Sequence, residues 1–333
     1  MKSLRVAIIL LLLLFSTSGI AAEKQLTIVH TNDMHSHFLG FSPEIDYRPL
    51  SINADSTLGG WTRVATVIIK TKKEKNNPVL VLDAGDFTMG SLFHMLSREE
   101  AFELRLLSAM GYDAVTLGNH EFDLKPAGLA RTLRSAKAKG GLPPIVFASA
   151  IFDRQKPVLA SLEDAFAEAG VKPYTILTRD GLRIGVFGLF GNSAMEFSPF
   201  AKPLTFSDPI ATARNVVDVL RHREKVDLVI CLSHGGLNDN PKFSEDEILA
   251  REVRGIDVII SGHTHTKLDQ PIIIGDTVIV QAWCYGKQVG ILDLALNNGK
   301  ASLKNYTPVP ITSAIAADPG IQRVIDSFKH KLD

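Results

Sequence analysis

The sequence predicts an α/β fold, a sandwich of two mixed β-sheets flanked by helices, from three observations. Five short runs rich in Val, Ile and Leu do not alternate with polar residues, which is typical of strands buried on both faces. Helical patterns separate most of these runs, and paired strand patterns follow the last one. The runs, each with the polar residues at its end, are 26–37, 79–86, 114–123, 228–236 and 258–265.

The first half of the chain alternates strand and helix patterns. A helix that opens at Trp61 has an apolar face and ends in the charged run 72–75. An irregular segment with two prolines, 38–57, precedes it. The other elements expected here are strands at 26–30, 79–82, 113–117, 145–149 and 183–190 and helices at 91–110 and 126–139, with a variable stretch between the last two strands.

The second half begins with a helix and finishes with antiparallel strands. Asp208 is expected to cap a helix whose first residue is Pro209, because proline suits the first helical position. Residues 272–280 predict two strands around a tight Gly-Asp turn, and residues 287–303 predict a hairpin around Asn-Asn-Gly. Both pairs are expected to complete a second sheet. A short amphipathic helix is expected over 318–332.

The first 22 residues predict a secretory signal peptide. Lys2 and Arg5 precede the apolar run 6–15, and small residues follow it. Ten apolar residues are too few to cross a bilayer, where about 18–20 are needed, so a retained anchor is the weaker interpretation. We therefore expect an exported protein, periplasmic or extracellular, without a stable membrane anchor.

The charge balance of the remaining chain argues against a polyanionic partner. Without Lys2 and Arg5, 34 of the 36 basic residues remain against 36 acidic ones, a formal charge of −2. Nothing in that balance favours binding to a nucleic acid polymer or to an anionic membrane.

Residues that can bind a metal follow the end of each of the five apolar runs. Ligands of parallel sheets bind at the carboxyl ends of the strands, so these side chains are expected to converge on one rim. Carboxylate, amide and imidazole groups together form a donor set suited to transition metals. The residues are Asp33, His35, Asp86, Asn119, His120, His234, His263 and His265.

Six motifs carry a resemblance to a known family. They are, in chain order, HTNDMHSHF, LGGWTRVATVI, DAGDF, GNHEFD, SHGG and SGHTH. In this order they resemble the calcineurin-like metallophosphoesterases, and more narrowly the catalytic domain of the 5′-nucleotidase branch. The resemblance implies the family's two-sheet sandwich, with a catalytic domain over 23–315. Residues 316–333 resemble the connector to the C-terminal nucleotide-binding domain of two-domain 5′-nucleotidases, a domain that this chain is expected to lack.

The resemblance implies two divalent metal ions, and the chemistry of the residues supports it. Asp33, His35 and His265 would bind the first ion, and the carboxylate of Asp86 would bridge the two. The implied ligands of the second ion are Asn119, His234 and His263. Such a mixed oxygen and nitrogen set suits Mn, Zn, Fe or Co better than Ca or Mg.

His120 and Asp123 are expected to act in catalysis and not as ligands. Asp123 lies three residues after His120 and can bond one nitrogen of its ring, which favours the protonated imidazole. The resemblance implies that this pair assists the leaving alkoxide as a general acid or stabilises the phosphoryl oxygens.

The resulting prediction is a metal-dependent phosphohydrolase that cleaves small phosphate esters, most simply 5′-nucleotides, by attack of a hydroxide held between the ions. One alternative is a hydrolase of the same fold that acts on cyclic nucleotides, nucleotide-sugar pyrophosphates or sulfur esters. The other is a metal-containing binding protein without turnover, against which His120 and Asp123 argue, since a scaffold has no use for them. The sequence identifies no partner chain. Candidates for contacts to the rest of the substrate are 38–57, Phe93, Phe122 and 283–285, although aromatic residues such as these are more often core or lid residues than base-stacking ones.

Overall fold

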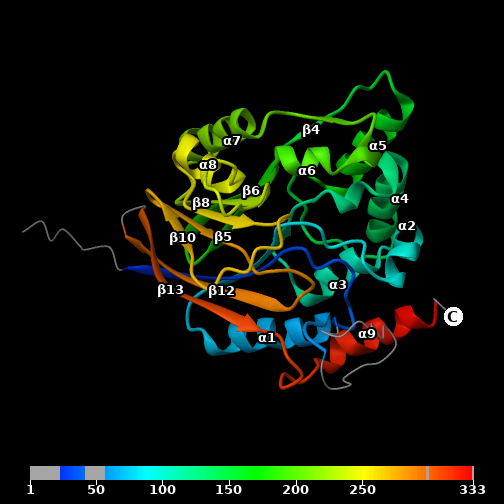
Figure 1. Ribbon diagram of the computed structural model, residues 1–333, viewed down its shortest axis with the longest axis horizontal. Helices are drawn as coiled ribbons and strands as arrows, with labels where there is room; N and C mark the ends of the chain where they lie inside the picture. The colour runs from blue at the N-terminus through cyan, green and yellow to red at the C-terminus, as the bar shows by residue number, and fades with distance from the viewer. Residues whose placement is uncertain (1–22, 42–56, 298–299, 332–333) are drawn as a thin grey trace, which may run out of the picture.

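The computed structural model describes residues 23–41, 57–297 and 300–331, and it confirms the predicted sandwich of two mixed sheets flanked by helices. In Figure 1, α7 (Pro209–Asp218) and α8 (Glu245–Glu252) lie over one sheet. On the opposite side of the molecule, α1 (Trp61–Glu74) and α9 (Pro319–Lys329) lie along the other sheet. The predicted signal peptide, 1–22, lies outside the described residues.

The first sheet has the strand order β13-β12-β1-β2-β3. Its three N-terminal strands run parallel to one another, and the hairpin of β12 and β13 adds to β1 in antiparallel fashion. The strands are β1 (Lys24–Thr31), β2 (Val79–Asp83), β3 (Ala114–Val115), β12 (Gln288–Asn297) and β13 (Lys300–Pro310).

The second sheet has the order β10-β11-β9-β8-β6-β5, with parallel pairing from β11 to β6 and an antiparallel strand at each edge. Its strands are β5 (Tyr174–Arg179), β6 (Leu182–Phe190), β8 (Leu228–His234), β9 (Val258–Ser261), β10 (Ile272–Ile274) and β11 (Thr277–Val280). A separate two-stranded sheet pairs β4 (Ala150–Ile151) with β7 (Thr205–Phe206).

Burial on both faces explains why the central strands do not alternate with polar residues. Along β8, Leu228, Ile230 and Leu232 pack against the other sheet, in a cluster with side chains of β1, β2 and β12. Val229 and Cys231 point the other way, into the cluster formed with α7 and α8. The polar residues of such a strand are therefore confined to its ends, where the functional side chains lie.

The helices begin and end largely where the sequence predicts. The Asp208 side chain accepts a hydrogen bond from the backbone of Ala211 at 2.8 Å, as expected of the helix cap. Asp318 caps α9 in the same way, through Ile321 at 2.8 Å. The remaining α-helices are α2 (Ser97–Glu100), α3 (Phe102–Met110), α4 (Lys125–Ala138), α5 (Pro157–Ala169) and α6 (Asn192–Glu196). In the part of the chain that the structure describes, no helix combines the length and apolar character needed to span a bilayer.

Two expectations about the strands are wrong. The strand pairs at 272–280 and 287–303 do not complete one sheet, because the first extends the second sheet and the other extends the first. The segment 145–148 is not a strand, since its backbone bonds are divided among different neighbours. Val146 N donates to Val115 O at 2.9 Å in the first sheet, and Ala148 N donates to Gly188 O at 2.9 Å in the second. This segment therefore links the two sheets.

The link leaves no room for a side chain at Gly188 of β6. A Cβ there would lie 2.0 Å from the Val146 carbonyl oxygen, a backbone atom that cannot rotate away. We expect Gly188→Ala to lower the free energy of unfolding by about 3 kcal/mol, the upper part of the range for overpacking. Gly185→Ala, on the same strand, meets the flexible side chain of Leu220, nearest at 2.8 Å, and should cost about 1 kcal/mol. Urea unfolding measures both, and equal losses would contradict the account.

Candidate metal centre

All eight converging residues predicted from the sequence lie at one edge of the sandwich, where the carboxyl ends of strands from both sheets meet. Asp33 and Asp86 follow β1 and β2 of the first sheet, and His234 ends β8 of the second. The five apolar runs are thus divided between two sheets. Their polar ends nevertheless converge on one rim, as expected.

The first group of side chains surrounds the point where β1 and β9 end. The Nε2 atoms of His35 and His265 lie 3.0 Å apart, and Asp33 Oδ1 lies 3.6 Å from that of His265. These three residues can offer one ligand atom each to a single ion. The predicted proximity of Asp33 and His265 is therefore confirmed.

The second group shares the carboxylate of Asp86 with the first. Asp86 Oδ2 lies 3.2 Å from His234 Nε2 and 3.9 Å from His35 Nε2. Asn119 Oδ1 completes this group, at 3.1 Å from His234 Nε2 and 2.9 Å from His263 Nδ1. Asp86 therefore contacts both groups of candidate ligands.

Hydrogen bonds behind two of the imidazoles turn Nε2 of each ring toward the centre. His234 Nδ1 donates to the Ala84 carbonyl at 2.8 Å, and His35 Nδ1 donates to the Thr88 carbonyl at 3.2 Å. A carbonyl can only accept, so the neutral ring keeps its lone pair on Nε2, facing other acceptors. Acceptor atoms at about 3 Å from one another repel unless a cation or a proton lies between them, so the donor set fits a metal ion.

Five of the seven predicted metal ligands, a set that excludes His120, have a left-handed backbone conformation. Their φ angles lie between 46° and 75° in Asp33, His35, Asp86, His263 and His265. Such conformations are uncommon outside glycine and asparagine and cost on the order of 1 kcal/mol or more each. Backbone hydrogen bonds between the loops stabilise these conformations. Asp33 N donates to Gly85 O at 2.9 Å, and His35 N donates to Asp86 O at 3.0 Å.

Two buried polar residues that are not predicted ligands position the carboxylates. Asn32 donates to Asp33 Oδ2 and to the Trp283 carbonyl, each at 2.6 Å, so it ties a candidate ligand to the loop after β11. Glu121 accepts from the backbone N–H groups of Asp86 and Thr88, both at 3.0 Å. Only the position of Asn32 directly before Asp33 could have indicated its role in the sequence.

Burial sets the protonation of the imidazoles. It lowers the pKa of His35 and His263 to about 3 and that of His265 to about 4, so these rings are neutral, the form that binds metals. His234 behaves differently, because burial would lower its pKa but the charges of Asp86 and Asp33 raise it to about 10. His234 is therefore expected to carry a proton when no ion is bound.

His120 and Asp123 form the predicted pair at the edge of the centre. His120 Nδ1 lies 2.7 Å from Asp123 Oδ2, and both side chains are about a quarter exposed. Burial alone would lower the pKa of His120, but the hydrogen bond to Asp123 and the charge of Asp86 outweigh it and raise the pKa. His120 also lies within ligand distance of His35 and Asp86, so the geometry suits either a catalytic group or a ligand.

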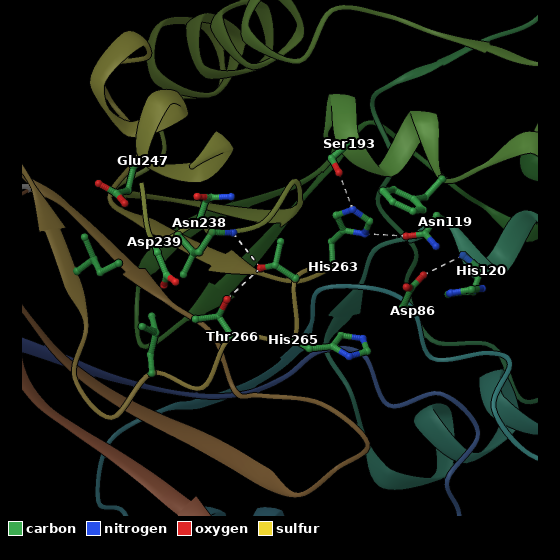
Figure 2. Close-up of a pocket in the computed structure, with 15 residues that line it drawn as sticks. Asp86, Asn119, His120, Ser193, Asn238, Asp239, Glu247, His263, His265 and Thr266 are labelled. Atoms are coloured by element: carbon green, nitrogen blue, oxygen red, sulfur yellow. Dashed lines mark hydrogen bonds between the residues drawn. The ribbon is translucent and has the colours of Figure 1, made fainter. Parts of the chain in front are cut away.

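An open cavity of about 820 Å³ adjoins the centre (Figure 2). Asp86, Asn119 and His120 lie at one end of it, and Asp239 and Glu247 lie at the other. A volume of this size suits a small-molecule ligand.

Two of the residues expected to contact the rest of the substrate are buried in the core. Phe93 is 2% exposed and Phe122 is fully buried, so neither can reach a ligand, and the alternative of a core role holds for both. Trp283 and Tyr285 are partly exposed. The ammonium of Lys287 lies 3.8 Å from the centroid of the Trp283 ring system, so it already covers one face of that ring. Most of the segment 38–57 lies outside the described residues. Phe197 also lines the cavity, and no motif or periodicity indicated it.

Comparison with known proteins agrees with this geometry. Residues 26–267 match the family described as calcineurin-like phosphoesterase. A trifunctional nucleotide phosphoesterase protein of Bacillus subtilis is 32% identical over 331 residues, which cover 92% of this chain and 21% of that protein. The 5′-nucleotidase of Rattus norvegicus is 32% identical over 335 residues, which cover 94% of this chain and 54% of that protein.

Solved structures show the same fold. The 5′-nucleotidase precursor of Thermus thermophilus superimposes with a TM-score of 0.73 at 27% identity, covering 92% of this chain and 59% of that one. The chain thus spans roughly half the length of the 5′-nucleotidases to which it is similar.

Metal binding should release protons, because His234 is protonated in the metal-free protein and must lose its proton to bind an ion. Its pKa is raised, to about 10, so metal affinity should rise as the pH rises from 6 to 8. Titration calorimetry of Mn²⁺ at pH 7, in two buffers of different ionisation enthalpy, should show release of about one proton or more. Identical heats in the two buffers, or an affinity that falls as pH rises, would contradict this.

Proposed function

The chain belongs to the calcineurin-like phosphoesterase family, and from this premise we propose that it hydrolyses phosphate esters with two divalent ions at the candidate metal centre. One observation carries the proposal. The buried Asp86 carboxylate lies between two groups of side chains, each able to hold one ion.

In the proposed assignment, Asp33, His35 and His265 hold the first ion, and Asp86 lies between the two. When bound, the ions polarise the phosphoryl oxygens and lower the pKa of the attacking water. Two divalent ions against two carboxylates leave the centre with a charge near +2, which attracts a phosphate. The residues proposed to hold the second ion are Asn119, His234 and His263.

His120 is proposed to serve the leaving group. Its ring lines the cavity, and Asp123 bonds Nδ1, so the proton available to the substrate lies on Nε2. Asp123 fixes that tautomer and favours the charged form, as a general acid needs. The backbone N–H of His120 donates to Asp86 Oδ1 at 2.9 Å, which ties the acid to the bridging carboxylate.

Nucleotides are the proposed substrate class. The relatives named above include a nucleotide phosphoesterase and 5′-nucleotidases, and the cavity beside the metal centre has room for more than a phosphate. We also propose that the protein is exported, on the strength of the basic, apolar and small-residue pattern in residues 1–22.

The proposed roles predict different effects on metal content for His120→Ala and Asp86→Ala. His120→Ala should keep both ions while turnover of a phosphate monoester falls by about 10²–10⁴-fold, because only the proton donor is removed. Asp86→Ala should lose bound metal and activity together, since both sites share its carboxylate. Metal content by mass spectrometry and phosphate release with added Mn²⁺ measure the two effects.

A surface histidine provides the control for these variants. His222→Ala removes a side chain that is 77% exposed and pairs only loosely with Asp218, at 3.9 Å, so metal content and turnover should both match the wild type. Loss of an ion in His120→Ala would show that His120 is a ligand. A wild-type protein that releases no phosphate from any nucleotide or aryl phosphate would refute the proposed function itself.

A further inference from the structure

Phe197 is an exposed aromatic residue beside the metal centre. Its side chain is 66% exposed, although phenylalanine is usually buried, and it lines the cavity. Its ring centroid lies 5.7 Å from that of His263, at an interplanar angle of 57°. Two other strongly exposed phenylalanines, Phe200 and Phe243, do not line this cavity.

The segment that presents Phe197 is anchored to the metal centre. Ser193 Oγ lies 3.0 Å from His263 Nε2, a contact drawn in Figure 2. The Glu245 carboxylate accepts from the backbone N–H groups of Asn192 and Ser193, at 2.7 and 2.8 Å. Phe197 follows Ser193 by four residues, so both lie on the same side of α6, toward His263. The backbone that carries the ring is therefore anchored beside a candidate ligand.

Other apolar side chains extend the surface that Phe197 begins. Leu237, Leu268 and Ile272 line the same cavity. A pocket with one polar, charged end and apolar walls suits a ligand with a phosphate at one end and a flat apolar part at the other. Exposed aromatic faces bind flat rings by stacking, and any nucleobase or aryl group offers such a face.

We propose that Phe197 is the stacking platform for a flat ring in the leaving group of the phosphate ester, a nucleobase or an aryl group. The inference rests on the proposed function, in which the phosphate of the ester binds at the metal centre. Under this proposal, a residue of the phosphoesterase domain itself contacts the ring of the substrate. Loss of one stacking contact lowers affinity by about 5- to 150-fold.

The test compares esters with and without a ring. We expect the ratio of kcat/KM for adenosine monophosphate to that for glycerol 3-phosphate to fall about 5- to 150-fold in Phe197→Ala. Phe197→Leu should show the same fall, because it keeps an apolar side chain but no ring, and Phe197→Trp should restore the ratio. Phe200→Ala is the matched control, since it removes a 50% exposed ring from the following turn, and it should leave the ratio unchanged.

A binding measurement keeps the inference separate from the proposed function. In the Mn²⁺-loaded protein, the ratio of Kd for adenosine monophosphate to Kd for inorganic phosphate should rise in Phe197→Ala by a similar factor, whether or not any ester is hydrolysed. An unchanged ratio in both assays would overturn the inference, and so would an equal loss for ringed and ringless ligands. A shift in sedimentation coefficient with unchanged ratios would overturn it too, because Phe197 would then dock another chain.

Discussion

The convergence of buried acceptor atoms around Asp86 is the constraint on which the rest of the structure depends. Asp33 and Asp86 are almost fully buried, and burying an unpaired carboxylate costs several kcal/mol. Divalent ions bound at the centre would offset that cost, because they place positive charge beside both carboxylates. The left-handed conformations of the ligand loops are held by bonds between loops. The segment 145–148 is hydrogen-bonded to both sheets, to Val115 in the first and to Gly188 in the second.

Much of this arrangement could be predicted because it depends on local patterns. Strands buried on both faces read as unbroken apolar runs, and a polar residue directly after such a run has to lie at the sheet edge. That reasoning brought Asp33, Asp86 and His234 together correctly, and the cap at Asp208 followed from its proline neighbour. Membership of the family, shown by the match over 26–267, agrees with the six motifs. The domain boundary near residue 315 and the roles of the site residues stay predictions.

The remaining features depend on tertiary contacts, which leave no periodic signal. The segment 145–148 looks like a strand because it is apolar, yet its hydrogen bonds are shared between two sheets. The helix α5 and the edge strand β5 lie in the stretch that the sequence left unassigned. Phe93 and Phe197 are the same residue type, but one packs in the core and the other faces the cavity. Long-range packing makes that difference.

The central claim is that Asp86 bridges two ions, and anomalous diffraction from crystals grown with Mn²⁺ tests it most directly. The account predicts two anomalous peaks, about 3.5–4 Å apart, one on each side of the Asp86 carboxylate. One peak should lie among Asp33, His35 and His265, and the other among Asn119, His234 and His263. A single peak at saturating Mn²⁺, or two peaks that do not share Asp86, would contradict the account.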